Sequence, residues 1–423
     1  MKRKFAILLS AMLLTQAVCG CGGAASSGTS SASASTGSIA SKSSEKAVIV
    51  TDEQDFTHEN GITRLAKEIY GDLNVEFFVL SEDAQERETQ ISSLRVEIMA
   101  GGGPDGYLLS SPTSNMTFNG EGRPAALFPD VQRTMQAGAF LPLDDYIKES
   151  EYLRSEDHFA PVFDTGKTDE GQVVLPITYY ASVFLLDKAQ LADPDFTPKT
   201  WDELVNCEDT AVLKVVRNNL YTWCGAGIPR IADYTTEKTI LTEENLTAQF
   251  ENLLAMPASE SFDEETALIQ SGSYAQTDEG MAYYAQNKDT VNAFAIPNTE
   301  GGVTAFITSY AAINRNSPKA DEVFRFFELL FSDEAQIDTE TVNDARGTLL
   351  MLGNVNSFLT HKNAYLQPEL LESVQSRVNA VRFYSVMDYT IYDTATTLTW
   401  EENPDCAAAA HSVMEALQTR LSE

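Results

Sequence analysis

Basic residues are scarce in this chain. Its 423 residues include 29 lysines and arginines against 62 aspartates and glutamates, which gives a formal net charge of −33. Such a charge repels polyphosphate and anionic lipid, and this argues against nucleic acid or acidic membrane surfaces as partners. Because the acidic residues are spread along the chain, the simplest interpretation is solubility outside the cell.

Cysteine and histidine are also rare, with five and four residues respectively. There is no CxxC pair and the histidines are scattered, so we expect no thiol redox site, no metal site and no cofactor. Cys207, Cys224 and Cys406 lie beyond the N-terminal segment, and an odd number leaves at least one unpaired. We expect free, partly buried thiols, with a Cys207–Cys224 disulfide as the alternative.

Long apolar runs are missing, and no stretch of 18 apolar residues occurs. The apolar segment Phe5–Val18 is short, follows the basic residues Lys2–Lys4 and ends in Val18-Cys19-Gly20-Cys21. This pattern predicts an export signal, and its end is typical of the lipobox of bacterial lipoproteins. We therefore expect residues 1–20 to be a lipoprotein signal peptide and Cys21 to carry acyl chains that anchor the protein to the cell membrane, on its extracytoplasmic side. The alternative is an uncleaved anchor helix.

The next segment is almost entirely glycine, alanine, serine and threonine from Gly22 to Ser44. Such a composition buries too little apolar surface to fold, so residues 21–46 are expected to form a flexible tether. The body that begins at Ala47 is long for one hydrophobic core and fits two.

The first part of the body alternates apolar strands with amphipathic helices. Strands are predicted over 47–50, 74–80 and 107–109, and this order indicates parallel pairing with helical crossovers. Ligands in such sheets bind beyond the carboxyl ends of the strands, and the polar residues there are Asp52, Glu82 and Ser110. The two carboxylates are candidate hydroxyl acceptors, with solvated loop acids as the alternative.

Two later helix starts are visible in the sequence. Thr200 and Glu203 have the spacing of a capping box, in which each side chain bonds a free backbone N–H. Ser317-Pro318 places a capping residue before a first-turn proline and predicts another helix start.

Five stretches of the body resemble, in order and spacing, segments of the extracellular solute-binding proteins of bacterial ABC importers, in their sugar-binding branch. They are Met99–Asp105, Ala137–Tyr146, Gly171–Lys188, Pro198–Leu204 and Ala312–Pro318. The fourth stretch, Pro-Lys-Thr-Trp-Asp-Glu-Leu, is close to the family's Pro-x-Thr-Trp-x-Glu-Leu.

The resemblance implies an α/β fold of two lobes joined by a hinge, the type II periplasmic-binding-protein-like fold, with a mixed, mostly parallel sheet flanked by helices in each lobe. Mapped onto this chain, the N-terminal lobe takes 47–158 and 303–355, and the C-terminal lobe takes 166–302 and 356–423. A solute binds between the lobes, and a hinge motion closes them over it.

The function implied by the resemblance is capture of a mono- or oligosaccharide and its delivery to the membrane permease of an ABC importer. No enzymatic activity and no cofactor are expected, and the protein is expected to act as a monomer. The same fold binding another solute, or serving a sensor, stays open as an alternative. An exported hydrolase is the third hypothesis, although Asp164-Thr165-Gly166 has no second copy to form an aspartic-protease pair.

Sugar binding needs aromatic faces to stack on and side chains that bond hydroxyl groups. Ser309 and Tyr310 stand where the family has glycines before the hinge strand, so they are expected to shape the cleft. Arg382 is a candidate for bonding a hydroxyl or a ligand carboxylate, with an exposed ion pair as its alternative. For each aromatic residue, core packing is the alternative. The aromatic candidates are Tyr179, Tyr180, Trp223, Tyr310 and Tyr384.

Overall fold

The structure is a computed structural model that describes residues 45–52, 61–71, 74–111, 125–153, 158–218, 225–258, 284, 286–332 and 368–422. The chain separates into two units, Met1–Gly37 and Ser38–Glu423, and every described residue belongs to the second. The predicted signal peptide, Cys21 and Trp223 lie outside the described residues. Within them, no helix has the length and apolar character needed to cross a bilayer.

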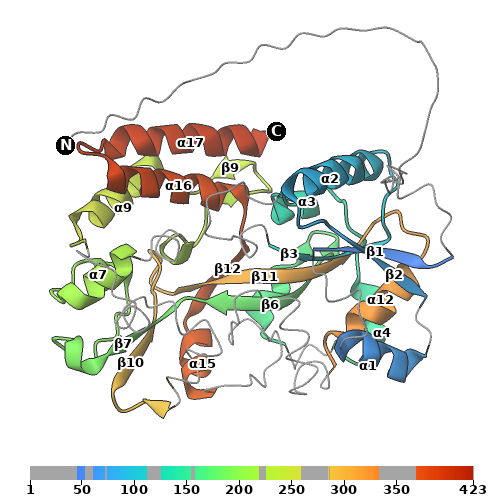
Figure 1. The fold of residues 1–423 in the computed structure, drawn as a ribbon, viewed down its shortest axis with the longest axis horizontal. Coiled ribbons are helices and arrows are strands. Elements are labelled where there is room, and N and C mark those ends of the chain that lie inside the picture. The colour runs from blue at the N-terminus through green and yellow to red at the C-terminus, as the bar shows by residue number, and fades with distance from the viewer. Residues whose placement is uncertain are drawn as a thin grey trace, which may run out of the picture. The chain divides into compact units, whose positions relative to one another are not determined.

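A six-stranded sheet organises the body (Figure 1). Its order is β12-β11-β3-β1-β2, and β6 pairs with β11 beside this path. As the alternating pattern predicted, β1 pairs in parallel with both β2 and β3. The strands are β1 Ala47–Thr51, β2 Val75–Val79, β3 Gly106–Ser110, β6 Leu175–Ala181, β11 Val303–Ile313 and β12 Val378–Phe383.

Helices cover both faces of this sheet because side chains alternate along its strands. Ile49 of β1 packs in one apolar cluster with α1 (Gly61–Tyr70) and α12 (Ala320–Leu329). Its neighbour Val50 belongs to a different cluster, with α2 (Ala84–Met99) and α3 (Val131–Gln136). Figure 1 shows the two helix pairs on opposite sides of β1 and β3.

A second apolar core lies away from this sheet. It is built on β7 (Val183–Asp187) and β10 (Val291–Ala295), which pair antiparallel. One face of the pair, with Phe184 and Phe294, packs against five helices. These are α6 Trp201–Val205, α7 Thr210–Asn218, α9 Glu243–Ala255, α16 Val386–Trp400 and α17 Cys406–Ser422.

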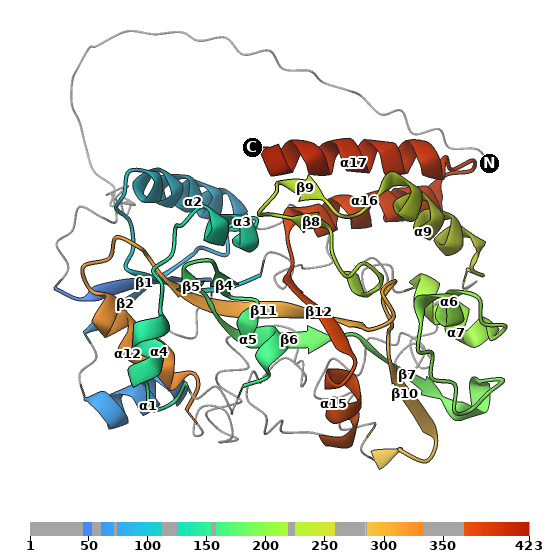
Figure 2. The same ribbon diagram turned by 180° about the vertical axis from the view of Figure 1, so that it is seen from behind.

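Short elements connect these parts. Two hairpins, β4 with β5 and β8 with β9, stand out in Figure 2. The short elements are α4 Asp144–Glu149, α5 Ala160–Asp164, β4 Lys167–Thr168, β5 Gly171–Gln172, the 3₁₀ turn Lys188–Gln190, β8 Ala232–Asp233, β9 Lys238–Thr239 and α15 Pro368–Gln375.

Strand β11 contacts segments that the sequence assigns to different lobes. Its first half, Val303–Ile307, pairs in parallel with β12. Its second half, Ser309–Ile313, pairs antiparallel with β3, and Ser309–Ala311 also pair with β6. All eleven residues of the strand are buried. Strand β11 therefore pairs with strands of both expected lobes: β3 of the N-terminal lobe, and β6 and β12 of the C-terminal lobe. The lobe boundaries themselves stay a prediction.

Two predicted helix starts are sharpened or corrected. The Thr200 hydroxyl accepts the Glu203 N–H at 3.2 Å as predicted, whereas the Glu203 carboxylate bonds the N–H of Lys199. The predicted helix start at Ser317 lies too early: α12 begins at Ala320 with Lys319 at the cap position, and the Ser317 hydroxyl accepts the Lys319 N–H at 3.0 Å while donating to Asp105 at 2.7 Å. Strand β2 is only partly buried, since it lies at the edge of the sheet.

The cysteines agree with the predicted free thiols where the structure describes them. Cys207 is half-buried and Cys406 is buried, and both are free. Cys224 lies outside the described residues.

Candidate functional site

The strand ends of the main sheet bring Asp52 and Ser110 together. The Asp52 carboxylate accepts the Ser110 N–H at 3.1 Å, because β1 and β3 are neighbours and end at the same edge. Its other oxygen lies 3.6 Å from Arg87 Nη2 of α2, and both side chains are buried. Asp52 is therefore no solvated loop acid, which was the alternative interpretation of this residue.

The third strand-end candidate lies apart from this pair. Glu82 is exposed, just before the Asp83 side chain that caps α2. In this structure it lies in a solvated loop, the alternative that the sequence left open.

Ser309 and Tyr310 lie in the middle of β11. Ser309 pairs with Ser110 of β3, and both residues are buried. The Tyr310 ring packs edge-on against Phe383 at 5.6 Å between centroids. Burial raises the pKa of Tyr310, and the nearby Asp52 charge raises it further. These two positions are thus buried next to the Asp52 strand end.

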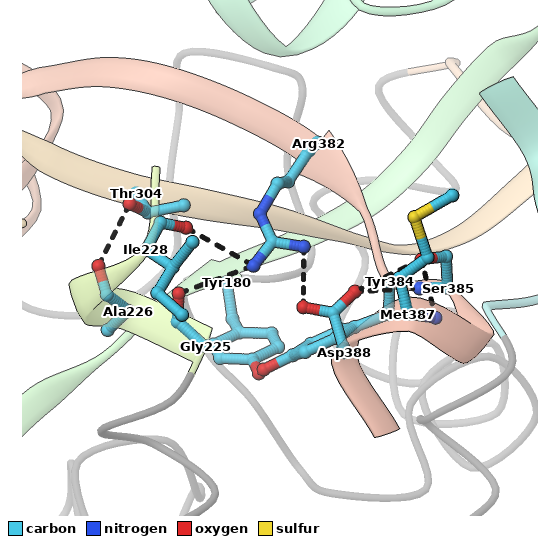
Figure 3. Close-up of polar contacts among 10 residues, drawn as sticks. All are labelled: Tyr180, Gly225, Ala226, Ile228, Thr304, Arg382, Tyr384, Ser385, Met387 and Asp388. Atoms are coloured by element: carbon cyan, nitrogen blue, oxygen red, sulfur yellow. Dashed lines mark hydrogen bonds and ion pairs between the residues drawn. The ribbon is translucent and has the colours of Figure 1, made fainter. Parts of the chain in front are cut away.

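Three aromatic rings from distant parts of the sequence, Tyr180, Phe306 and Tyr384, pack on one another in a small buried cluster; Figure 3 shows the two tyrosines. Phe306 of β11 lies 4.2 Å from Tyr384, centroid to centroid, with the rings 13° from parallel. Tyr180 of β6 stacks on Phe306 at 5.3 Å, and its hydroxyl contacts the hydroxyl of Tyr384. Core packing, the alternative for Tyr180 and Tyr384, describes their surroundings here. We call Tyr180, Phe306, Tyr384, Arg382 and Asp388 the ring–arginine cluster.

Arg382 of β12 holds this cluster together (Figure 3). Its Nη1 lies 2.6 Å from Asp388 Oδ1, and both side chains are buried, so the ion pair is not the exposed one considered from the sequence. Its guanidinium lies 4.7 Å from the Phe306 ring centroid, within reach of a cation–π interaction. Its Nη2 donates to the carbonyls of Gly225 and Ile228 at 3.4 and 3.2 Å. Within the described residues, the buried Nε has no hydrogen-bond partner.

Asp388 is fixed by the start of α16. Ser385 caps this helix, and the Asp388 Oδ2 accepts the Ser385 N–H at 2.9 Å in a capping box. One carboxylate therefore serves both the helix start and the arginine. The Val386 N–H also donates to the Pro129 carbonyl at 3.2 Å, which ties the cluster to the segment before α3.

A cavity of about 280 Å³ lies beside the cluster, lined by Arg382, Phe383, Tyr234 and Gln132 among others. Nearby, Asp130 caps α3 by accepting the Arg133 N–H at 3.1 Å. Burial raises the pKa of Asp130, and the charge of Asp388 adds to this shift. The cavity is thus lined by Gln132 of α3 and Arg382 of β12, and the Asp130 and Asp388 carboxylates interact electrostatically nearby.

Tyr179 is separate from the ring–arginine cluster. It is buried in the core that includes α2 and α3, and its hydroxyl accepts a hydrogen bond from Gln375 at 2.5 Å. This matches the core-packing alternative that the sequence left open.

Sequence reasoning missed Arg87, Phe306, Gly225 and Asp388. Asp388 had a visible signal, because Ser385-x-x-Asp388 has the spacing of a capping box next to Arg382. Gly225 approaches Tyr384 so closely that a Cβ there would lie 2.8 Å from the tyrosine oxygen. Arg87 and Phe306 follow from tertiary pairing, which no local pattern displays.

Comparison with known proteins decides the family. The family model described as bacterial extracellular solute-binding protein matches residues 66–337, more than half of the chain. The chain belongs to this family. Solute-binding proteins of this kind bind small solutes rather than transform them, and the family places the chain outside the cytoplasm. A search among curated protein sequences finds no match.

Solved structures agree on the fold. The sugar-binding protein MalE from Xanthomonas citri is similar with a TM-score of 0.59 and 12% identity, over 89% of this chain and 97% of that chain. A family 1 solute-binding protein from Alicyclobacillus acidocaldarius gives 0.53 and 12%, over 89% and 98%. UgpB from Mycobacterium tuberculosis, in complex with glycerophosphocholine, is similar with a TM-score of 0.52 and 12% identity, over 89% of this chain and 98% of that chain. The expected two-lobed α/β binding-protein fold is therefore confirmed.

Proposed function

We propose that this chain is the lipid-anchored solute-binding protein of an ABC importer, which captures a mono- or oligosaccharide between its lobes and delivers it to the membrane permease. The observation that carries the proposal is the family match across residues 66–337. It assigns solute binding, and the importer, the sugar and the anchor are our additions.

The site residues support a sugar as the solute. Asp52, Ser110 and Ser309 supply polar groups next to β11, the strand whose two halves have different partners. The ring–arginine cluster lies around the other half of the same strand, where Phe306 packs against both tyrosines. Sugar recognition requires aromatic faces and hydroxyl-bonding groups, and β11 with its partner strands brings residues of both kinds together, the rings being packed on one another in this structure. We propose that Trp223, which lies outside the described residues, also contacts the solute.

A thermal-shift screen over sugars, amino acids and polyamines tests the solute. A solute that binds the folded chain and not the unfolded chain raises the free energy of unfolding by about 2.7 kcal/mol when its concentration is one hundred times its dissociation constant. We expect a saturating rise in melting temperature with at least one mono- or oligosaccharide. A rise with an amino acid or a polyamine, and none with any carbohydrate, would reject the sugar assignment and leave the family intact.

Membrane fractionation tests the anchor. We expect Cys21→Ser to move the protein from the membrane fraction to the soluble fraction, because stable attachment depends on acyl chains at this thiol. Cys19→Ser is the matched control and should leave the protein in the membrane fraction. If the Cys21 variant stays with the membranes, the N-terminal segment acts as an uncleaved helix instead.

A further inference from the structure

A second pocket lies in the C-terminal core, away from the ring–arginine cluster. It has a volume of about 370 Å³ and is bounded by α9, by the start of α6 and by the segments around Arg230 and Glu300. This volume falls in the range of small-molecule sites, about 300 to 1,000 Å³. The segment Pro229–Arg230 lines both this pocket and the cavity beside Arg382, so it forms the wall between them.

One side of the pocket is a row of amide side chains. Asn245, Gln249 and Asn252 of α9 all line it, and their spacing of four and three residues places them on one helix face. The adjoining face of α9 holds apolar residues such as Leu246 and Leu253 in the core, and Gln249 lies at the border of the two faces. Each amide offers two donors and one acceptor oxygen, so the row can bond groups of either kind.

Gln249 is the residue that calls for a ligand. Only 4% of the residue is exposed, yet it lines the pocket. Within the part of the chain that the structure describes, its Oε1 has no hydrogen-bond partner. A buried acceptor without a donor destabilises a fold, so a glutamine here is explained if a bound molecule supplies an O–H or N–H group.

The remaining walls define the chemistry of that molecule. Trp201 forms an apolar wall, held in place by the close approach of Gly227, whose Cβ position would be 2.7 Å from the indole ring. Arg230 and Glu300 form an ion pair at 3.5 Å and are both partly exposed, so their charges largely neutralise each other. Among the described residues that line the pocket, the one further charge is the exposed Asp202.

We propose that this pocket is a second binding site, for a small neutral molecule rich in hydroxyl groups, of the size of a monosaccharide. Each hydroxyl both donates and accepts, which matches the mixed capacity of the amide row, and the C–H face of such a molecule packs on Trp201. An anion is opposed by Asp202 and by the net charge of −33, and a cation finds only the exposed carboxylates of Asp202 and Glu300 among the described lining residues. The site is independent of the solute that the family holds between its lobes.

Tryptophan fluorescence of the detergent-purified full-length protein tests this site. The chain has three tryptophans, so the double variant Trp223→Phe, Trp400→Phe leaves Trp201 as the only reporter. Titration with glucose, galactose, N-acetylglucosamine and myo-inositol should give a saturable change in its emission with at least one of them. In the same background, Gln249→Leu and Asn252→Ala should each weaken this binding by about tenfold or more, because the hydroxyl partner is lost.

Matched controls separate this site from the interlobe solute. Gln132 lines the cavity beside Arg382, and Asn218 is exposed on α7. The variants Gln132→Leu and Asn218→Ala should therefore leave the affinity measured in this titration unchanged. Glucosamine and glucuronate, the charged relatives of glucose, should bind more weakly than glucose. The proposal is overturned if no neutral polyol changes the emission, if the change survives Gln249→Leu, or if a charged relative binds more tightly. None of these outcomes bears on the importer role.

Discussion

Two arginine–carboxylate pairs in this protein are equally buried but differ in the groups that surround the arginine. Arg87 approaches Asp52 at 3.6 Å, and the carboxylate also has the Ser110 N–H as a partner. Arg382 approaches Asp388 at 2.6 Å, lies over Phe306 and donates to two carbonyls. The first pair fastens a helix to a strand end, whereas the second connects a strand, a helix start and an aromatic stack.

The difference shows why residue types alone do not rank such pairs. Removing one partner of a buried ion pair leaves an uncompensated charge, and the free-energy cost grows with the number of groups that lose their partner. Asp52 would keep a backbone donor without Arg87. If Arg382 were replaced, three groups would lose their partner at once: the carbonyls of Gly225 and Ile228 and the carboxylate of Asp388.

The largest effect is therefore expected for Arg382→Met. We expect the free energy of unfolding to fall by about 3–5 kcal/mol, the range for breaking a buried pair. Denaturant unfolding followed by circular dichroism measures it. A loss below about 1 kcal/mol would show that Asp388 and the two carbonyls are satisfied by water in solution.

The matched substitution Arg87→Met should cost less. We expect a loss of about 2 kcal/mol, since Asp52 keeps the Ser110 N–H while the Ala125 carbonyl loses the Arg87 Nε donor, now at 2.8 Å. The same unfolding assay applies, with Glu82→Gln on the exposed loop as the control, expected to change stability by under about 0.5 kcal/mol. If Arg87→Met lowers the free energy of unfolding more than Arg382→Met does, the number of partners that each arginine holds does not determine the cost of removing it.

A smaller loss is expected for Tyr384→Phe. The variant keeps the stack on Phe306 and removes only the hydroxyl that contacts Tyr180, so we expect about 1 kcal/mol. Tyr179→Phe, which removes the acceptor of the Gln375 hydrogen bond in the other core, is the matched control and should cost a similar amount. Thermal unfolding compares the two, and a loss several times larger in Tyr384→Phe would assign the hydroxyl pair a role beyond an ordinary hydrogen bond.

The smallest effect concerns the pH dependence of Asp130, which feels the charge of Asp388. Burial raises the pKa of Asp130 above its ordinary value of 3.8, so the fold favours the protonated form. Relative to Asp130→Asn, which keeps the acceptor for the Arg133 N–H, the natural chain should lose stability as the pH rises from 3.8 through the raised pKa. Unfolding midpoints of both proteins between pH 3 and 8 measure this, and a difference that is constant over that range would contradict it.

Local patterns predicted much of the fold. The parallel pairing of β1 with β2 and β3 followed from apolar runs alternating with helices, and the Thr200 cap followed from the sequence spacing. Ser317 misled us because a hydroxyl before a proline also suits a loop, and here it bonds Asp105 from a distant segment.

The site was less accessible to sequence reasoning. Tyr180, Arg382 and Tyr384 were candidates for their chemistry alone, and only the pairing of β6 and β12 with β11 brings them together. Phe306 resembles any other apolar residue of a buried strand, and Arg87 any other charge on a helix. Tyr179 and Tyr180 are adjacent in sequence, yet their side chains belong to different clusters because a strand alternates its faces.

The burial of strand β11 also predicts which part of the chain resists proteolysis. All eleven residues are buried, and three other strands hydrogen-bond to it. Its amides should be among the last to exchange with deuterated water, since their exposure requires the sheet to come apart. After limited proteolysis, we therefore expect the fragment that contains Val303–Ile313 to stay non-covalently associated with the fragments that contain β3, β6 and β12.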